Sequence, residues 1–93
     1  MKKCTVEMWG LPREISGLQE VEVQLKDDAG LRDVVAALKR KVPKLEGVVI
    51  CSGEDRLEDT CAFNINGQFF LEDEKLQLKD GDCLRLLTLA TGG

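Results

Sequence analysis

Residues 31–43 read LRDVVAALKRKVP and give the clearest indication of the fold. Their apolar side chains recur at intervals of three and four residues, the spacing that places them on one face of a helix. The five residues on this face are Leu31, Val34, Val35, Leu38 and Val42. Pro43 disfavours a helix beyond Val42, because proline lacks the backbone N–H and clashes with the preceding turn. Since only one face is apolar, we expect this helix to pack against a sheet.

Before this helix, the apolar residues of two short segments alternate with polar ones, the period of a strand with one buried face. In the segment 3–9, Cys4, Val6 and Met8 lie on one face and Thr5, Glu7 and Trp9 on the other. The segment 21–25 alternates in the same way. Residues 10–20 contain two glycines, a proline and a serine, and they predict a loop between two antiparallel strands.

After the helix, residues 46–60 carry one apolar run, 48–50, which fits either a short buried strand or a loop packed on the core. The segment 62–65 alternates again. Asn66-Gly67 then predicts a type I′ hairpin turn, because both residues accept positive φ, and residues 68–71 should return as the partner strand.

The last predicted strand, residues 83–89, follows a turn at residues 79–82. The alternation of this strand places Leu84 and Leu86 on one face. Its other face carries Arg85, Leu87 and Leu89. The element order is therefore two strands, one helix and at least two more strands.

The chain has 93 residues and a formal net charge of −4. This length suits one domain over residues 1–93, but it leaves little room for a catalytic cleft beside a full core. We therefore expect a carrier or binding module rather than an enzyme. The negative charge argues against nucleic acid or an anionic membrane as partner. No apolar run reaches the length of a membrane span, and polar residues interrupt any signal peptide, so we expect a cytoplasmic protein.

The chain contains four cysteines and no histidine. There is no C-x-x-C pair, so neither a zinc ribbon nor a histidine-dependent catalytic triad is available. Cys4, Cys61 and Cys83 lie in predicted strands, where we expect reduced thiols that pack as small hydrophobes. Cys51 falls in a predicted loop, and its role is open. The acidic residues of 54–59 could bind a divalent cation, but a solvated loop is the favoured interpretation and no metal site is predicted.

The sequence ends in Gly92-Gly93, two residues without side chains. Such a tail is thin enough to lie extended in a narrow channel of another protein, where a Cβ would collide. We expect a flexible tail over residues 90–93, with the terminal carboxylate of Gly93 as the reacting group and Gly92 as its spacer. The alternative is a frayed terminus without a role.

The chain resembles the MoaD/ThiS family of ubiquitin-like sulfur carriers, and within it the MoaD branch. The resemblance covers nearly the whole sequence and rests on four segments: LPREISG at 11–17, NING at 64–67, LKDGD at 78–82, and the terminal Gly-Gly. It implies an α+β, ubiquitin-like β-grasp fold in ββαββ order. That fold has a mixed sheet of four to five strands and one main helix on one face. One departure is that residues 88–91 contain no proline, which such tails commonly carry.

The resemblance implies a carrier mechanism in which the chain itself binds no cofactor. A MoeB- or ThiF-like adenylating enzyme uses ATP and Mg²⁺ to activate the Gly93 carboxylate. A persulfide-bearing partner then supplies sulfur to form a thiocarboxylate, with molybdopterin biosynthesis as the expected destination. The chain would be a monomer when free, or the small subunit of a synthase with a MoaE-like large subunit.

Leu87, Leu89, Phe69 and Phe70 are candidates for an apolar surface that docks on the activating enzyme, although core packing explains these side chains equally well. Two other functions remain open. The same activated carboxylate could be joined to a lysine, which would make the chain a protein modifier. The domain could also be a passive ubiquitin-like interaction module that never uses its terminus.

Overall fold

A computed structural model describes residues 1–70 and 78–89, with the side chains of Phe69 and Phe70 outside the description. Along the chain the elements are β1 (Lys2–Met8), α1 (Leu11–Ser16), β2 (Glu20–Leu25), α2 (Leu31–Lys41), the 3-10 turn η1 (Pro43–Leu45), β3 (Cys61–Ile65), β4 (Gln68–Phe70) and β5 (Cys83–Thr88). The predicted strands and main helix are confirmed to within a residue or two at each end. Residue 71, the predicted end of β4, lies outside the described residues.

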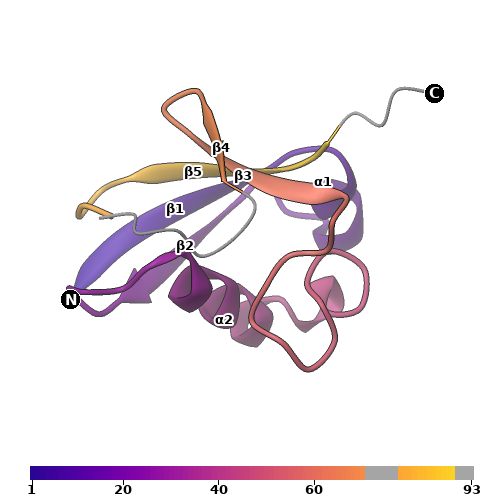
Figure 1. Ribbon diagram of the computed structural model, residues 1–93, viewed down its shortest axis with the longest axis horizontal. Coiled ribbons are helices and arrows are strands. Elements are labelled where there is room, and N and C mark those ends of the chain that lie inside the picture. The colour runs from indigo at the N-terminus through magenta and orange to yellow at the C-terminus, as the bar shows by residue number, and fades with distance from the viewer. Residues whose placement is uncertain (71–77, 90–93) are drawn as a thin grey trace.

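The five strands form one mixed sheet in the order β2-β1-β5-β3-β4. β1 and β5 are parallel neighbours at its centre, and the other three pairs are antiparallel. Parallel neighbours need a crossover connection, and α2 lies within the connection between β1 and β5 (Figure 1). The ubiquitin-like β-grasp arrangement expected from the sequence is therefore confirmed, with five strands.

The hydrophobic core lies between one face of this sheet and α2 (Figure 1). From the helix, Leu31, Val34, Val35 and Leu38 are buried, as the three-and-four spacing predicts. From the central strands, the buried side chains are Cys4, Val6, Met8, Leu84 and Leu86. α2 has 11 residues, and none of the helices in the described ranges is both long and apolar enough to cross a membrane.

Residues 11–16 form a short helix, α1, where the sequence predicted only a loop. Gly10 and Pro12 stand at its start and Gly17, with φ of 72°, at its end. Proline suits the first turn of a helix and glycine the position after it, so these residues punctuate a helix here rather than a turn. The six-residue helix is too short to show a repeating apolar pattern, which is why the sequence did not reveal it.

The segment after η1 is a loop packed on the core, the second of the two predicted possibilities. Leu45, Val49 and Ile50 are fully buried, and Leu57 is nearly so. Ile50 makes only isolated bridges, one to Glu46 and one to Leu57, instead of joining the main sheet. This loop therefore extends the core beyond the end of α2 rather than adding a strand.

Both predicted turns are confirmed. Asn66 and Gly67 have φ of 53° and 85°, the positive values that a type I′ hairpin needs. In the turn at residues 79–82, Asp82 Oδ2 accepts a 2.7 Å hydrogen bond from Lys79 N, and Gly81 has φ of 90°. Asp80 Oδ1 accepts from Lys3 N at 2.7 Å, which ties this turn to β1. The LKDGD segment thus sets where β5 begins beside β1.

Candidate functional site

The predicted reacting residues, Gly92 and Gly93, lie outside the described residues, but the root of their tail is described. Leu89, directly after β5, donates from its backbone N–H to the carbonyl of Thr60 at 2.7 Å. On the other side, the hydroxyl of Thr88 accepts from the N–H of Leu11 at 2.9 Å. The chain is therefore held from both sides up to Leu89, so the point from which residues 90–93 depart is fixed by the fold.

Gly10 allows α1 to approach β5 closely at this root. Its φ is 63°, a conformation that side chains disfavour, and a Cβ built on it would lie 3.0 Å from Thr88 Oγ1. The same threonine hydroxyl caps the N–H of Leu11. A side chain at position 10 would therefore push against the residue that anchors the end of β5.

The face of the sheet opposite α2 carries a group of four interacting side chains, Glu7, Trp9, Cys83 and Arg85, which we call the outer-face cluster. Glu7 is at its centre. One carboxylate oxygen accepts from Trp9 Nε1 at 3.1 Å and lies 3.5 Å from Arg85 Nε, and the other accepts from Cys83 Sγ at 3.3 Å. The Arg85 guanidinium stacks over the Trp9 ring, 5.7 Å from its centroid. Glu7 thus orients both the indole and the guanidinium.

The hydrogen bonds in the outer-face cluster affect two pKa values in opposite directions. The pKa of Glu7 lies below its ordinary value, chiefly because its carboxylate accepts from Cys83 and then from Trp9. The pKa of the Cys83 thiol is raised, first by partial burial and then by the neighbouring Glu7 carboxylate. Cys83 is therefore a hydrogen-bond donor that holds Glu7 ionised, rather than an activated thiolate.

An open hollow of about 370 Å³ adjoins this cluster at the end of the sheet where the tail begins. It is lined by Trp9, Gly10, Asn64, Arg85, Leu87 and Thr88. Trp9 is a large, mostly apolar side chain, yet it is 49% exposed. Exposed aromatic and arginine side chains are typical anchors of protein interfaces, so this hollow is suited to contact with a partner.

Of the four predicted docking residues, Leu87 lines this hollow and is half-buried, and Leu89 is also half-buried. Phe69 and Phe70 belong to β4, and their side chains lie outside the description. The sequence prediction left out Trp9 and Arg85. The alternation in segments 3–9 and 83–89 already placed both on the face opposite the core, and that signal could have identified them.

The structure corrects the expectation for one cysteine and answers an open question for another. All four cysteines are free, but Cys83 is exposed on the outer face, whereas Cys4 and Cys61 are buried as expected. Cys83 shares its face with Arg85 because the two are two residues apart on one strand. Cys51 is buried, and its thiol points to the carbonyl of Leu57 at 3.6 Å. It helps close the loop after η1.

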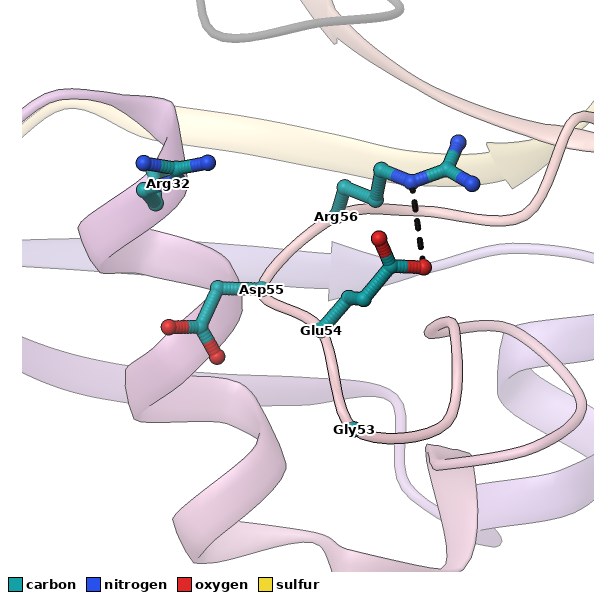
Figure 2. A pocket seen from close by; sticks show the side chains of 5 residues that line it. All are labelled: Arg32, Gly53, Glu54, Asp55 and Arg56. Carbon is teal, nitrogen blue, oxygen red and sulfur yellow. Dashed lines mark ion pairs between the residues drawn. The ribbon is translucent and has the colours of Figure 1, made fainter.

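A second hollow, of about 290 Å³, lies between α2 and residues 53–56 (Figure 2). Its carboxylates already have cationic partners: Glu54 pairs with Arg56 at 3.4 Å and Asp55 with Lys39 at 2.8 Å. Figure 2 shows Arg32 on α2, across the hollow from Glu54 and Arg56. Over residues 1–70 and 78–89, no group of three or more potential ligand side chains is arranged to hold a metal ion. We assign no ligand to this hollow.

Comparisons with known proteins agree with this fold. A family model described as the ThiS family matches residues 6–93. A curated protein of Chlamydomonas reinhardtii, the molybdopterin synthase sulfur carrier subunit, is 30% identical over 81 residues, which are 87% of this chain and 87% of that protein.

Two solved structures show the same similarity. The crystal structure of SAMP1 from Haloferax volcanii superposes with a TM-score of 0.80 at 26% identity, over 98% of this chain and 99% of the other. The solution structure of the small archaeal modifier protein 1 from Methanosarcina acetivorans gives a TM-score of 0.76 at 27% identity, over 100% and 98% of the two chains. Sulfur carriers and modifiers are thus both among the similar proteins.

Proposed function

The chain belongs to the ThiS family, and from this premise we propose that it is a sulfur carrier whose Gly93 carboxylate becomes a thiocarboxylate. The observation that carries the proposal is that the family match extends through residue 93 and so includes Gly92-Gly93. The name of the curated relative supports molybdopterin biosynthesis as the pathway that receives the sulfur. The chain would act as a carrier or a synthase subunit, without catalytic residues of its own.

The proposed chemistry takes place in partner proteins. A carboxylate is a poor acyl donor, because its leaving group would be oxide. In the site of a MoeB- or ThiF-like enzyme, the Gly93 carboxylate attacks the α-phosphate of Mg²⁺-bound ATP and displaces pyrophosphate. The acyl adenylate then offers AMP as a good leaving group. A persulfide sulfur replaces AMP at the carbonyl carbon, and cleavage of its S–S bond by a thiol leaves the thiocarboxylate on Gly93.

The outer-face cluster and its hollow are the proposed docking surface for these partners, including a MoaE-like large subunit of a synthase. This surface is continuous with the root of the tail, since Leu87 and Thr88 line the hollow and Leu89 is the next residue. A partner seated on Trp9, Arg85 and Leu87 would therefore receive the tail from a fixed starting point. Docking on a rigid surface removes part of the entropic cost of threading four residues into an active site.

The proposal is tested by changing the tail and measuring ATP–pyrophosphate exchange by the adenylating enzyme of the same organism. Deleting Gly92 and Gly93, or adding two residues after Gly93, should abolish exchange. The temperature of unfolding should change little, because few packing contacts are expected in a terminal tail. The same two residues added before Met1 are the matched control. Exchange that survives the C-terminal extension would contradict the carboxylate mechanism.

Docking is tested separately. Trp9→Ala and Leu87→Asp should raise the KM of the adenylating enzyme for this protein roughly tenfold or more, the effect of losing an interface anchor. The free energy of unfolding should fall by only about 1 kcal/mol or less, since both side chains lie on the sheet face opposite the core. A large loss of stability with an unchanged KM would mean that these residues serve packing alone.

A second candidate function, a protein modifier, is favoured by the similarity to the two archaeal modifier structures. The two functions differ in the nucleophile that attacks activated Gly93. Attack by sulfur gives a free protein with a heavier terminus. Attack by a lysine amine joins the protein to another one, which carries a Gly-Gly remnant after digestion. We expect intact-mass analysis of protein from its own cells to show a thiocarboxylate fraction. Conjugates that disappear on deletion of Gly93, with no thiocarboxylate, would establish the modifier, and neither product would favour a passive interaction domain.

A further inference from the structure

Among the described strands, β2 is at the edge of the sheet and pairs with β1 alone. In an antiparallel pair, every second residue directs its N–H and C=O to the partner strand. Met8 N–H bonds to Gln19 C=O at 2.8 Å, and the register therefore directs the backbone groups of Val21, Val23 and Leu25 toward β1. The N–H and C=O groups of Glu20, Glu22 and Gln24 point away from β1, outward from the free edge of the sheet. These six groups can pair with another extended chain.

A groove of about 360 Å³ runs beside this edge, between β2 and α2. From β2 it is lined by Glu22, Val23 and Gln24, and from α2 by Ala37, Arg40 and Lys41. Lys41 reaches across it, and its Nζ donates to the outward-facing carbonyl of Glu22. Within the described residues no other strand pairs with this edge. A flexible lysine is thus the group that covers it.

The groove is basic on its helix side although the whole chain has a net charge of −4. Lys39 on the same turn is paired with Asp55, but in the part of the chain that the structure describes no carboxylate pairs with Arg40 or Lys41. Arg40 is therefore available to a partner's carboxylate, and Lys41 can exchange the Glu22 carbonyl for one. By contrast, the side chains of Glu20 and Glu22 lie on the opposite face of β2 and make that face of the edge acidic.

We propose that the groove between β2 and α2 binds an extended segment of a partner protein, which adds to the sheet as a sixth strand beside β2. Alternate side chains of that segment would face the helix, where an apolar residue suits Ala37 and acidic residues suit Arg40 and Lys41. The remaining side chains would lie beside Glu22 and Gln24 and should be neutral. Main-chain hydrogen bonds supply affinity in this mode, and the alternating side chains supply specificity. This site uses neither the tail nor the outer-face cluster.

A second copy of this chain is a poorer occupant. Antiparallel pairing of two β2 strands about their centre would place Glu22 opposite Glu22, and like charges directly opposite each other are destabilising. Two Lys41 side chains would also meet without a carboxylate between them. A segment with acidic side chains toward the helix gives Lys41 a new partner when it leaves the Glu22 carbonyl.

The test is a titration of the full-length ¹⁵N-labelled protein with the blocked peptide TETVTET, followed by amide NMR. Its glutamates and valine alternate with neutral threonines, as the groove requires. We expect shifts that saturate at Glu20, Glu22, Gln24 and the last turn of α2, and slower hydrogen exchange of the Glu22 and Gln24 amides. Arg40→Glu and Lys41→Glu should each weaken binding roughly tenfold, because each replaces attraction by repulsion. Arg13→Glu, which changes the net charge equally on α1, should have little effect.

The control peptide carries the same side chains, with N-methyl groups on its threonines. These residues should direct their backbone toward β2 in an antiparallel pairing, so the peptide should not bind. Equal binding of the methylated peptide, or shifts confined to the outer face, would overturn the proposal. Concentration-dependent shifts of β2 without any peptide would assign the edge to a second copy instead. A variant that lacks Gly92 and Gly93 should bind the peptide unchanged, which separates this result from the proposed function.

Discussion

On the face of the sheet that α2 covers, the central strands present the buried apolar side chains of the core, among them Val6 and Leu84, which are 0% exposed. On the opposite face, the same two strands present Glu7, Cys83 and Arg85, which bond to one another and remain open to solvent. One strand thus serves two purposes, because its side chains alternate between the faces. Substitutions on the two faces should therefore separate effects on stability from effects on partner recognition.

The largest contrast is expected between the thiols of the two faces. Cys83 should react with a disulfide reagent in the native protein roughly a thousandfold or more faster than Cys4 and Cys61. A buried thiol must wait for an opening that costs on the order of 5 kcal/mol. The thiolate is the reacting form, and the raised pKa of Cys83 keeps most of the thiol protonated at neutral pH. The rate at Cys83 should therefore rise as the pH increases. Mass spectrometry after timed labelling measures this, and unfolded protein, in which all four thiols should react, is the control.

Similar rates at Cys4 and Cys83 would mean that the two faces are not distinct. The position of Cys51 in the series carries separate information, because it lies in the loop after η1. A rate between the two groups would show that this loop opens independently of the sheet.

The next contrast compares two leucines on opposite faces of β5. Leu84→Ala should lower the free energy of unfolding by about 2–5 kcal/mol, since it leaves a cavity in the core. Leu87→Ala should lower it by about 1 kcal/mol or less, because Leu87 is only half-buried and lies on the face opposite the core. Urea unfolding followed by circular dichroism measures both. Equal losses would place Leu87 in the core and remove it from the proposed docking surface.

A smaller loss of stability is expected at the root of the tail, where Gly10 contacts Thr88. Gly10→Ala should destabilise the protein by about 1–3 kcal/mol, because it combines an unfavourable φ with a Cβ pressed against Thr88. Gly17→Ala is the matched control, since Gly17 also has positive φ but has no atom within 4 Å of the added Cβ. It should cost about 1 kcal/mol. If the two variants unfold alike, the close approach of α1 to β5 contributes nothing.

The smallest effect concerns Glu7 on the outer face. Its pKa lies below the ordinary value, so its contribution to stability is present above the pKa of the unfolded chain and is lost as the pH falls through the pKa of the folded state. Cys83→Ala removes the first cause of this shift and should move the pKa of Glu7 back up. Carboxyl ¹³C NMR titration measures it. An unchanged pKa in the variant would mean that the Cys83 hydrogen bond does not hold Glu7 ionised.

Much of the fold follows from local signals. The period of residues 31–43, the alternation of the strands and the Asn66-Gly67 turn each depend on neighbouring residues, and each was confirmed. α1 and the loop after η1 could not be predicted in the same way. α1 is tied to β5 by a contact distant in sequence, from Leu11 N–H to Thr88 Oγ1 across 77 positions. The loop after η1 is held by irregular local hydrogen bonds, such as the one from Glu58 N–H to the carbonyl of Val49, and these follow no repeating period.

For the candidate site, the alternation of the sequence indicated which residues leave the core, but not which of them meet. Glu7 and Arg85 become neighbours only because β1 and β5 pair in parallel in a register that sets them side by side. The same register brings Cys83 to Glu7, and so an expected core thiol became a surface hydrogen-bond donor.

The order of the strands and the main helix, the buried faces of α2 and the central strands, and the Gly-Gly segment of the proposed chemistry all follow from the sequence alone. These properties are read along the chain, because periodicity and backbone preference act between close neighbours. Tertiary structure was needed to find the outer-face cluster, the anchoring of the tail at Thr88 and Leu89, and the open edge of β2 beside Lys41. Those properties arise between segments that meet only when the sheet assembles, since the register of strand pairing is set by the whole core.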